Sequence, residues 1–385
     1  MDPRENVPLG RTAVTVSRLG VGLAPMIGAD RHIDDRTADE IVHEAVRSGL
    51  RYVDVSPLYG LGRSEAAIRR ASTALGPGAL TVSTKAGRLL RRRTVRNRLM
   101  ARVREVHYAP SAIATVGGFA RLALERARSR AVGRGVDRAA ARAIGKRPAA
   151  PAVAIHDFTP SGLLRSARES LARLGRDDVE ILLLHDPDGL SDAQLDAAWA
   201  TLVRLRDGGR ARAIGISSND AASLARMLER VHPDVVLLAG RYTLVDQGAM
   251  DDLFPAAQAR GIAVILGGVF NGGILADPDA TDRFDYRPAS SLERRRARRL
   301  AAIAASHGVS PAAAAIQFAA AHPAVTTVLV GAVSAEQLAD DVRLAEAPIP
   351  ARFWDALVRA RLLRPDAPVP VSPSVPVSPS VPVAS

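Results

Sequence analysis

Short apolar runs alternate with longer segments of helical periodicity along most of the chain. In the first helical segment Ile41, Val42, Ala45 and Val46 recur at helical spacing, and Gly49 ends the pattern. The expected strands are the apolar runs at 19–23, 51–55, 80–85, 178–184, 211–216, 234–238, 262–266 and 326–330. The expected helices lie at 37–48, 64–75, 160–173, 192–206, 220–230, 248–259 and 291–306. Because strands that are apolar on both faces need cover all round, the pattern predicts an α/β fold, a closed (β/α)8 TIM barrel.

Three segments stand outside this strand–helix repeat. Apolar residues around a turn at Gly10 predict an N-terminal β-hairpin. The third strand is separated from its helix by residues 88–156, whereas such loops usually have about two to six residues, so this segment is a long insert. From Val369 the hexamer Val-Pro-Val-Ser-Pro-Ser occurs twice and begins a third time, which predicts an extended, disordered C-terminal tail. We therefore expect a barrel domain at 1–365 that contains the insert, and a tail at 366–385.

The net charge of +12 is concentrated in the insert. Between Arg91 and Arg147 the chain has 16 Lys and Arg residues against three acids, so the remainder is close to neutral. Helical patterns lie near 111–131 and 137–145. The insert can be interpreted as solvated Arg-rich helices, as a lid over the substrate, or as a surface for nucleic acid or another anionic partner. Its aromatic residues are only Tyr108 and Phe119, too few for base stacking, so nucleic acid is not an expected partner.

Composition excludes several classes of site. The chain has no cysteine, so disulfides, thiolate metal sites, iron–sulfur clusters and cysteine nucleophiles are ruled out. No stretch reaches the roughly 18 apolar residues of a membrane span. The first residues lack the basic end and apolar run of a signal peptide. These observations lead us to expect a soluble cytoplasmic protein with no membrane partner.

Reactive side chains fall at or just beyond the ends of three consecutive strands. Asp54 ends the second strand and Tyr59 follows five residues later, Lys85 ends the third strand, and His185 ends the fourth. Because the carboxyl ends of parallel barrel strands meet at one face, we expect these side chains to lie together. A phenol has a pKa near 10 and needs a neighbouring cation to work at neutral pH, which Lys85 could supply. Taken singly, each of these residues is more often a packing or solvated residue.

In this order the four residues resemble the catalytic set of the aldo-keto reductase family. The resemblance is carried by the segment from Asp54 to Glu65, by Ser83-Thr84-Lys85 and by Leu184-His185-Asp186-Pro187, and it covers 7–87 and 157–346. It implies a barrel that binds a nicotinamide cofactor and needs no metal. It also implies that Tyr59 exchanges a proton with the substrate oxygen, that Lys85 lowers the Tyr59 pKa, that Asp54 holds Lys85, and that His185 orients the substrate.

Further stretches are most similar to the branch of NAD(P)-dependent aldose dehydrogenases that act on L-fucose and related sugars, a branch that includes pyridoxal dehydrogenases. These stretches are Leu184 to Asp188, Leu237 to Gln247 and Gly267 to Leu275. The resemblance implies oxidation of an aldose or similar hemiacetal to a lactone. Two alternatives stay open: a carbonyl reductase of secondary metabolism, and a barrel-based binding protein whose basic insert contacts nucleic acid. The substrate, the direction of reaction and the oligomeric state are not fixed by these residues.

The residues that bind the cofactor are expected in the C-terminal half of the chain. Gly20-Val21-Gly22 and Gly60-Leu61-Gly62 each lack the third glycine of a Rossmann fingerprint. The resemblance implies that Asn219 contacts the nicotinamide carboxamide and that the loops after the seventh and eighth strands hold the rest of the cofactor. The residues implied there are Phe270, Asn271, Gly272, Gly273, Leu275, Gly331, Val333, Ser334, Gln337 and Asp341. Because Gly331, Val333 and Gln337 are uncharged where NADP-using relatives carry Lys or Arg, we predict NAD, with NADP as the alternative.

Overall fold

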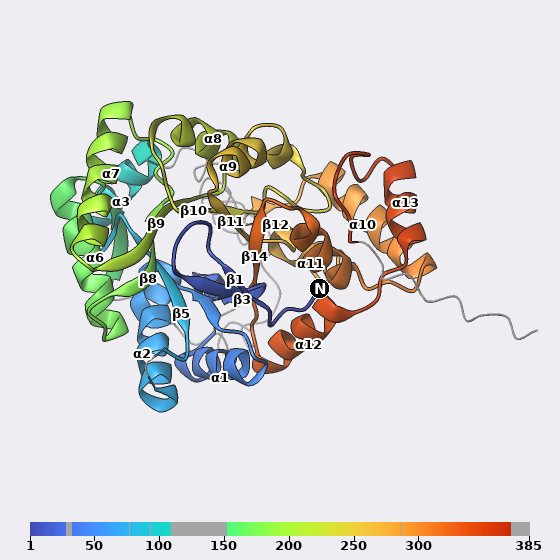
Figure 1. The fold of residues 1–385 in the computed structure, drawn as a ribbon, viewed down its shortest axis with the longest axis horizontal. Coiled ribbons are helices and arrows are strands. Elements are labelled where there is room, and N and C mark those ends of the chain that lie inside the picture. Colours follow the sequence, from blue (N-terminus) through green and yellow to red (C-terminus); the bar gives the residue numbers. More distant parts are fainter. Residues whose placement is uncertain (28–32, 77, 93, 109–151, 286, 371–385) are drawn as a thin grey trace, which may run out of the picture.

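Eight parallel strands close into a barrel in the computed structural model, which describes residues 1–27, 33–76, 78–92, 94–108, 152–285 and 287–370 (Figure 1). In order around the barrel the strands are β3 (Leu19–Gly22), β4 (Tyr52–Asp54), β5 (Thr81–Ala86), β8 (Val179–His185), β9 (Ala211–Ser218), β10 (Val235–Ala239), β11 (Ala263–Gly267) and β14 (Val325–Val330). Strand β14 pairs with β3 and completes the circle. The predicted (β/α)8 barrel is therefore confirmed, and its strands follow one another in chain order.

A ring of helices surrounds the barrel (Figure 1). These helices are α1 (Asp35–Arg47), α2 (Arg63–Leu75), α6 (Pro160–Leu174), α7 (Asp192–Asp207), α8 (Ala221–Arg230), α9 (Leu253–Arg260), α11 (Pro311–Ala321) and α12 (Ala335–Glu346). Two more, α10 (Ser291–Ser306) and α13 (Ala351–Arg359), pack against each other beyond the ring. Side-chain caps fix several of the starts: Thr159 caps α6, and Ser191 begins α7 with a capping box.

Several helical regions differ from the sequence prediction, and among them helices α12 and α13 lie where no helix was expected. The segment expected as a helix at 248–259 is a 3-10 turn, η3 (Gly248–Met250), followed by α9. Helix α11 was not predicted, because its residues from Ala313 to Ala320 are all buried. A helix that is apolar all round has no polar face, so it lacks the amphipathic periodicity by which helices are recognised.

The N-terminal hairpin closes one end of the barrel. Its strands β1 (Asn6–Pro8) and β2 (Thr15–Ser17) are antiparallel, as predicted. Buried Leu9 and Val16 pack in one cluster with inward-facing residues of the barrel strands such as Ile181. A second, larger core lies between the strands and the helices. The amino-terminal end of the barrel is thus filled with apolar side chains, and polar chemistry is left to the carboxyl end.

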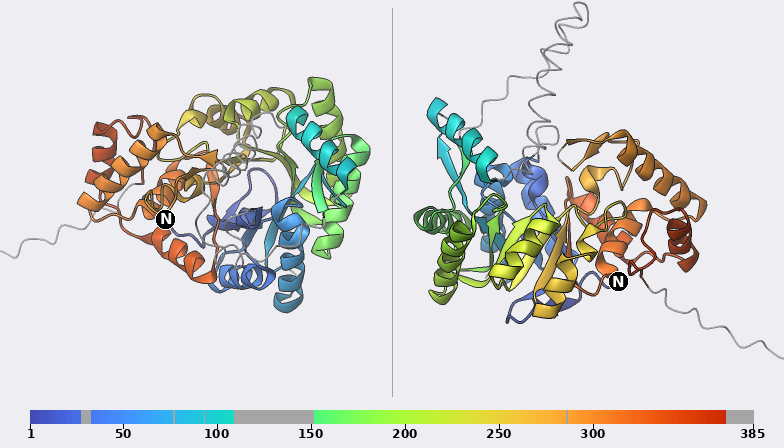
Figure 2. Two further views of the ribbon diagram at one scale, coloured as in Figure 1. Left: turned by 180° about the vertical axis from the view of Figure 1, so that it is seen from behind. Right: turned by 90° about the horizontal axis from the view of Figure 1, so that it is seen from above.

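The insert begins and ends as a two-stranded sheet that the sequence pattern did not predict. Strands β6 (Arg88–Arg92) and β7 (Ala152–His156) are antiparallel, with Arg88 opposite His156. Helix α3 (Val95–Tyr108) contacts β7 and extends beyond the barrel helices in Figure 2. The helices expected near 111–131 and 137–145 lie outside the described residues.

The C-terminal segment is described as far as residue 370. Residues 366–370 form no helix or strand, and Ala367 among them is buried. The remainder of the predicted tail lies outside the described part of the chain. Within that described part, no helix combines the length and the apolar character that crossing a membrane would require.

Candidate active site

The structure brings Asp54, Tyr59, Lys85 and His185 together at the carboxyl end of the barrel. Strands β4, β5 and β8, which carry three of them, are direct neighbours in the sheet. Tyr59 begins the 3-10 turn η2 (Tyr59–Gly62) that follows β4. The four residues keep between 1% and 7% of their surface exposed. Residues that are distant in sequence thus form one buried polar cluster.

A tight turn places the phenol of Tyr59 in this cluster. The amide of Tyr59 donates to the carbonyl of Ser56, and the amide of Leu58 donates to the Ser56 hydroxyl. Gly60 and Leu61 then adopt left-handed backbone angles, with φ of 62° and 55°. Leu61 has a side chain and so pays a strain cost at this angle that glycine avoids. The Gly-rich stretch therefore serves the turn behind Tyr59.

Lys85 and Asp54 form a buried ion pair. The Lys85 Nζ lies 2.7 and 2.6 Å from the two carboxylate oxygens of Asp54 and donates to the carbonyl of Val55 at 3.2 Å. Ser83 donates a further hydrogen bond to Asp54 at 2.6 Å. The same ammonium lies 4.5 Å from the centre of the Tyr59 ring. Charge pairing and hydrogen bonding therefore offset the cost of removing both charges from water.

Burial dominates the pKa of Tyr59 in this cluster. Burial raises the pKa of the phenol well above its ordinary value, and the negative charge of Asp54 adds to the effect. The Arg88 cation acts in the other direction but does not overcome burial. The ammonium of Lys85 is engaged by Asp54, which offsets its field at the phenol. Tyr59 is consequently protonated at neutral pH in this arrangement.

His185 is held as a neutral imidazole. Burial lowers its pKa well below the ordinary value, and the cations of Arg88 and Lys85 add to this. The Ser56 hydroxyl lies 3.2 Å from Nδ1 and already accepts a hydrogen bond from the Leu58 amide. Its hydrogen is thus available to Nδ1. On the other side, the Asp186 carboxylate lies 3.6 Å from Nε2. Both neighbours favour the tautomer with the proton on Nε2.

Sequence reasoning missed Ser56, Asp186 and Arg88 as members of this cluster. Arg88, at the root of the insert, is 5% exposed and donates to the Asp186 carboxylate at 2.8 Å. Its charge acts on both Tyr59 and His185. Ser56 and Asp186 stand within three residues of predicted site residues and could have been found from that proximity. Arg88 was set aside with the insert, although only two residues separate it from Lys85.

The predicted cofactor loop after β11 is tightly folded. Asn271 begins the 3-10 turn η4 (Asn271–Gly273) and is fully buried. Its Nδ2 donates to the carbonyl of Gly240 at 3.1 Å and to Asp285 at 2.9 Å. At Gly272, which has a φ of 76°, an added Cβ would lie 2.8 Å from the backbone oxygen of Asp285. Glycine is required at this position both by the backbone angle and by the close approach.

The predicted loop after β14 leads directly into α12. Ser334 caps the helix by accepting from the amide of Gln337, whose side chain accepts from the amide of Val333. Gly331 precedes them and lies against Pro25. Burial raises the pKa of Asp341 to about 7. Because β11 and β14 are paired, this loop and the one after β11 leave from adjacent strand ends.

Asn219 directly follows β9, beyond Ser217 and Ser218. Its backbone carbonyl accepts a hydrogen bond of 3.0 Å from Nε of Arg241. The two serine hydroxyls are occupied elsewhere, on the Leu184 carbonyl and the Asp188 carboxylate. The side chain of Asn219 takes part in none of these hydrogen bonds.

Comparison with known proteins identifies the family of this barrel. The sequence profile described as the Aldo/keto reductase family matches residues 18–115 and 126–361. The chain belongs to the aldo-keto reductase family. The match reaches further than the resemblance predicted, because it includes most of the segment at 88–156. As an aldo-keto reductase, the protein is an oxidoreductase that uses a nicotinamide cofactor, NAD or NADP.

Two characterised relatives are similar over nearly the whole chain. The chain is 32% identical to a pyridoxal 4-dehydrogenase of Microbacterium luteolum, over 92% of this chain and 96% of that protein. It is also 32% identical to a D-threo-aldose 1-dehydrogenase of a Pseudomonas species, over 91% of this chain and 95% of that protein. The expected placement near aldose and pyridoxal dehydrogenases is confirmed at the level of sequence similarity.

Solved structures share the fold at lower identity. An aldo-keto reductase of Bacillus halodurans in its holo form has a TM-score of 0.65 at 21% identity and covers 94% of this chain and 96% of its own. The glycerol dehydrogenase of Gluconobacter oxydans has a TM-score of 0.63 at 17% identity and covers 96% of this chain and 98% of its own. These similarities support the fold of this aldo-keto reductase.

The loops after β11 and β14 fit a nicotinamide cofactor. Asn271 Oδ1 and Asp341 Oδ2 are buried and have no hydrogen-bond partner within the described ranges. Buried polar atoms of this kind normally have a partner, and the hydrogen-bond donors of a dinucleotide can supply one. At the loop after β14, the start of α12 presents its first amides, which suit a phosphate group.

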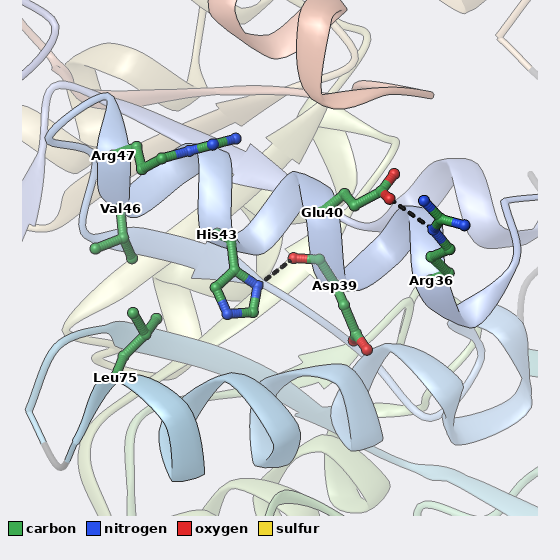
Figure 3. Close-up of a pocket in the computed structure, with 7 residues that line it drawn as sticks. All are labelled: Arg36, Asp39, Glu40, His43, Val46, Arg47 and Leu75. Atoms are coloured by element: carbon green, nitrogen blue, oxygen red, sulfur yellow. Dashed lines mark hydrogen bonds and ion pairs between the residues drawn. The ribbon is translucent and has the colours of Figure 1, made fainter.

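A surface groove lies elsewhere on this aldo-keto reductase. It runs between α1 and α2, on the outside of the helix layer (Figure 3). Its lining residues are Arg36, Asp39, Glu40, His43, Val46, Arg47 and Leu75. Most are charged, and Arg36 pairs with Glu40 one helical turn away, as is usual on an exposed helix face. None of the predicted site residues lines this groove.

Proposed function

We propose that this aldo-keto reductase is an NAD-dependent dehydrogenase that oxidises an aldose, L-fucose or a related sugar, to a lactone. The hydroxyl at carbon 1 of a cyclic aldose is a hemiacetal, and removing a hydride and a proton from it leaves the carbonyl of a lactone. The names of the two relatives support this substrate class, since one acts on aldoses at carbon 1 and the other on pyridoxal. The observation that carries the proposal is the contact of Tyr59 with the buried pair of Lys85 and Asp54.

Tyr59 is the group that exchanges the proton. During oxidation the substrate O–H proton passes to the phenolate oxygen of Tyr59 while the C–H hydrogen leaves as hydride. The bound nicotinamide supplies the hydride acceptor. The high pKa of Tyr59 means that the phenolate is a minor form at neutral pH, so oxidation is expected to accelerate as the pH rises. Lys85 stabilises the phenolate when it forms, from a position held by Asp54.

His185 orients the substrate oxygen. As a neutral imidazole with its proton on Nε2, it donates a hydrogen bond to the hydroxyl or carbonyl oxygen without competing with Tyr59 for the transferred proton. Its ring lies edge-on to that of Tyr59, with the ring centres 6.1 Å apart. One substrate oxygen between the two rings can accept from His185 and exchange its proton with Tyr59.

The loop after β14 supports NAD as the cofactor. Residues Gly331, Val333 and Gln337 offer no positive charge to a 2′-phosphate, and Gln337 is already engaged with the Val333 amide. The buried carboxyl of Asp341 would repel a phosphate whenever it is ionised. We propose that Asn219 holds the nicotinamide end, and that Phe270 to Leu275, together with Ser334 and Asp341, holds the remainder of the cofactor.

A carbonyl reductase of secondary metabolism is the second candidate. It is favoured by the protonation of Tyr59, because a phenol that keeps its proton at neutral pH is suited to donate it to a carbonyl oxygen. A nucleic-acid-binding role gains no support from the described residues, since the greater part of the basic segment lies outside them. Family membership favours an enzyme over a binding protein.

A spectrophotometric screen tests the proposal. Reduction of NAD is followed at 340 nm with L-fucose, related aldoses and pyridoxal, and each reaction is repeated with NADP. We expect turnover of at least one aldose, a preference for NAD, and loss of about 100-fold or more of kcat in the Tyr59→Phe variant, the usual scale for a general acid–base group. Turnover of carbonyl substrates with NADH but of no sugar would favour the reductase, and a strong NADP preference would refute the cofactor assignment.

A further inference from the structure

A short hairpin follows the predicted cofactor loop after β11. It consists of β12 (Arg283–Phe284) and β13 (Arg287–Pro288), and Asp285 follows β12 with a left-handed φ of 53°. An angle of this kind in a residue with a side chain persists only where surrounding contacts hold it. The carboxylate of Asp285 supplies such contacts, because it is largely buried and is bound by Arg241 and Asn271.

Arg241 reaches three separate loops from its place after β10. Its Nε donates to the Asn219 carbonyl at 3.0 Å, and its Nη1 donates to the Gly240 carbonyl at 2.8 Å. Its Nη2 donates to Oδ2 of Asp285 at 3.0 Å. One planar guanidinium therefore joins the loop after β9, the loop after β10 and the hairpin beyond β11.

The second oxygen of Asp285 extends this connection to the loop after β11. Oδ1 accepts from Nδ2 of Asn271 at 2.9 Å, and the same Nδ2 also donates to the Gly240 carbonyl. The backbone of Asp285 lies so close to Gly272 that an added Cβ would approach it within 2.8 Å. The carboxylate is thus shared by a guanidinium that holds Asn219 and an amide that begins the turn from Asn271 to Gly273.

We propose that Arg241 and Asp285 are positioning residues for the cofactor, which set the loops of Asn219 and of Asn271 to Gly273 in one arrangement before binding. This inference rests on the proposed function, which assigns those two loops to the cofactor. Neither Arg241 nor Asp285 belongs to the predicted site. Ordering loops on binding costs free energy, so loops that are fixed in advance bind their ligand more tightly.

The alternative is that the pair only stabilises the fold. A purely structural role would lower the stability and the fraction of folded enzyme, so it would reduce the apparent kcat but leave the Kd for NADH and both KM values unchanged. A positioning role loosens one side of the site, so it weakens cofactor binding while leaving the substrate side, formed by Tyr59, Lys85 and His185, largely as it was. The distinction can be measured as a split between the two Michaelis constants.

The experiment measures the Kd for NADH by its fluorescence, and the KM values for NAD and for the best sugar, in the full-length protein. The variants are Asp285→Asn, which keeps the shape but loses the carboxylate, Asp285→Ala and Arg241→Lys. We expect the Kd for NADH and the KM for NAD to rise about tenfold or more in Asp285→Ala, the equivalent of losing one charge-assisted contact. The KM for the sugar should stay within about twofold, and Asp285→Asn should fall in between.

A control comes from Arg230 and Asp196, an exposed Arg–Asp pair joined by two hydrogen bonds between α7 and α8. Asp196→Ala should leave the Kd for NADH unchanged. If Asp285→Ala does not fold, Asp285→Asn and Arg241→Lys carry the test. Cofactor affinity within twofold of wild type in the folded variants, or a parallel rise of both KM values, would overturn the inference. A wild-type protein that binds neither NADH nor NADPH would refute the proposed function itself, and the inference with it.

Discussion

The guanidinium of Arg88 donates a hydrogen bond of 2.8 Å to the carboxylate of Asp186, the residue that follows His185. This contact ties the root of the insert to the candidate active site. Arg88 also lowers the pKa of Tyr59, whereas Asp186 raises it. The pair therefore holds two opposing charges beside the phenol, and removing the cation leaves the carboxylate to act alone.

Replacing Arg88 with Met should raise the pKa of Tyr59. Oxidation needs the phenolate, so its pH profile should move upward and its rate at neutral pH should fall by up to about tenfold for each unit of the shift. The pH above which reduction declines should move by the same amount, because both directions depend on the same phenol. Steady-state rates measured between pH 6 and 10 test this expectation.

Two further variants serve as controls for Arg88. Arg88→Lys keeps a cation and should restore most of the profile. Arg91→Met removes another cation of the same strand. Arg91 pairs with Glu169 on α6, away from Tyr59. An unshifted profile in Arg88→Met, or an equal shift in Arg91→Met, would contradict the role given to Arg88.

Ser56 is predicted to fix the tautomer of His185. In Ser56→Ala the hydrogen-bond donor facing Nδ1 is lost, so the fraction of the tautomer with its proton on Nδ1 should increase. Nitrogen-15 NMR of histidine-labelled protein distinguishes the two forms, and His185→Gln identifies the signal. We expect kcat to fall about tenfold, with the KM for NAD unchanged.

A wild-type His185 that carries its proton on Nδ1 would disprove this assignment. Ser56→Thr retains the hydroxyl and should keep the wild-type tautomer. It therefore controls for disturbance of the turn that leads to Tyr59, whose neighbour Leu58 donates to the same hydroxyl.

Breaking the pair of Lys85 and Asp54 should cost stability as well as activity. Lys85→Met leaves the Asp54 carboxylate buried without its counter-ion, and the free energy of unfolding should fall by about 3–5 kcal/mol. The double variant Lys85→Met with Asp54→Asn should be less destabilised than the sum of the two single changes. Urea unfolding followed by circular dichroism measures each value.

The exposed pair of Arg230 and Asp196 again supplies the comparison. Arg230→Met should lower the free energy of unfolding far less than Lys85→Met, as is typical of surface pairs. An equal decrease in the free energy of unfolding in Lys85→Met and Arg230→Met would show that the buried pair stabilises the fold no more than a surface pair does.

Asp341 should make the cofactor-free protein less stable as the pH rises. Its folded-state pKa of about 7 lies above the ordinary value near 3.8, so between those values the native state binds the proton that the unfolded chain has released. The free energy of unfolding should then decrease with rising pH by up to about 1.4 kcal/mol per unit across this window, and level off above it.

Asp341→Asn should remove most of this slope and improve the use of NADP relative to NAD, because no carboxylate is left to repel a 2′-phosphate. Asp340→Asn is the control, since Asp340 is the exposed neighbour and pairs with Arg343. Chemical denaturation at pH 5 and pH 8 measures how the free energy of unfolding of each protein changes with pH. An identical slope in Asp341→Asn and wild type would refute the prediction.

The sequence by itself was sufficient for the barrel and for the order of its reactive residues. The apolar runs and helical periods are local properties, and they predicted the strands and most of the surrounding helices. Asp54, Lys85 and His185 could be placed at one face because the carboxyl ends of parallel strands meet there. Helix α11 escaped prediction because burial on all sides removes the polar face that marks a surface helix.

Only the tertiary structure showed the contacts between residues that are far apart in the chain. Arg88 lies opposite His156 in the sheet of β6 and β7, and no local pattern relates two strands at opposite ends of the insert. Arg241 and Asp285 are joined across 44 residues, so their shared hold on Asn219 and Asn271 cannot be read from either segment alone. The pKa of Tyr59 was decided in the same way. The sequence identified the neighbouring cation, Lys85, but the depth of burial, which raises the pKa of the phenol, is determined only by the folded chain.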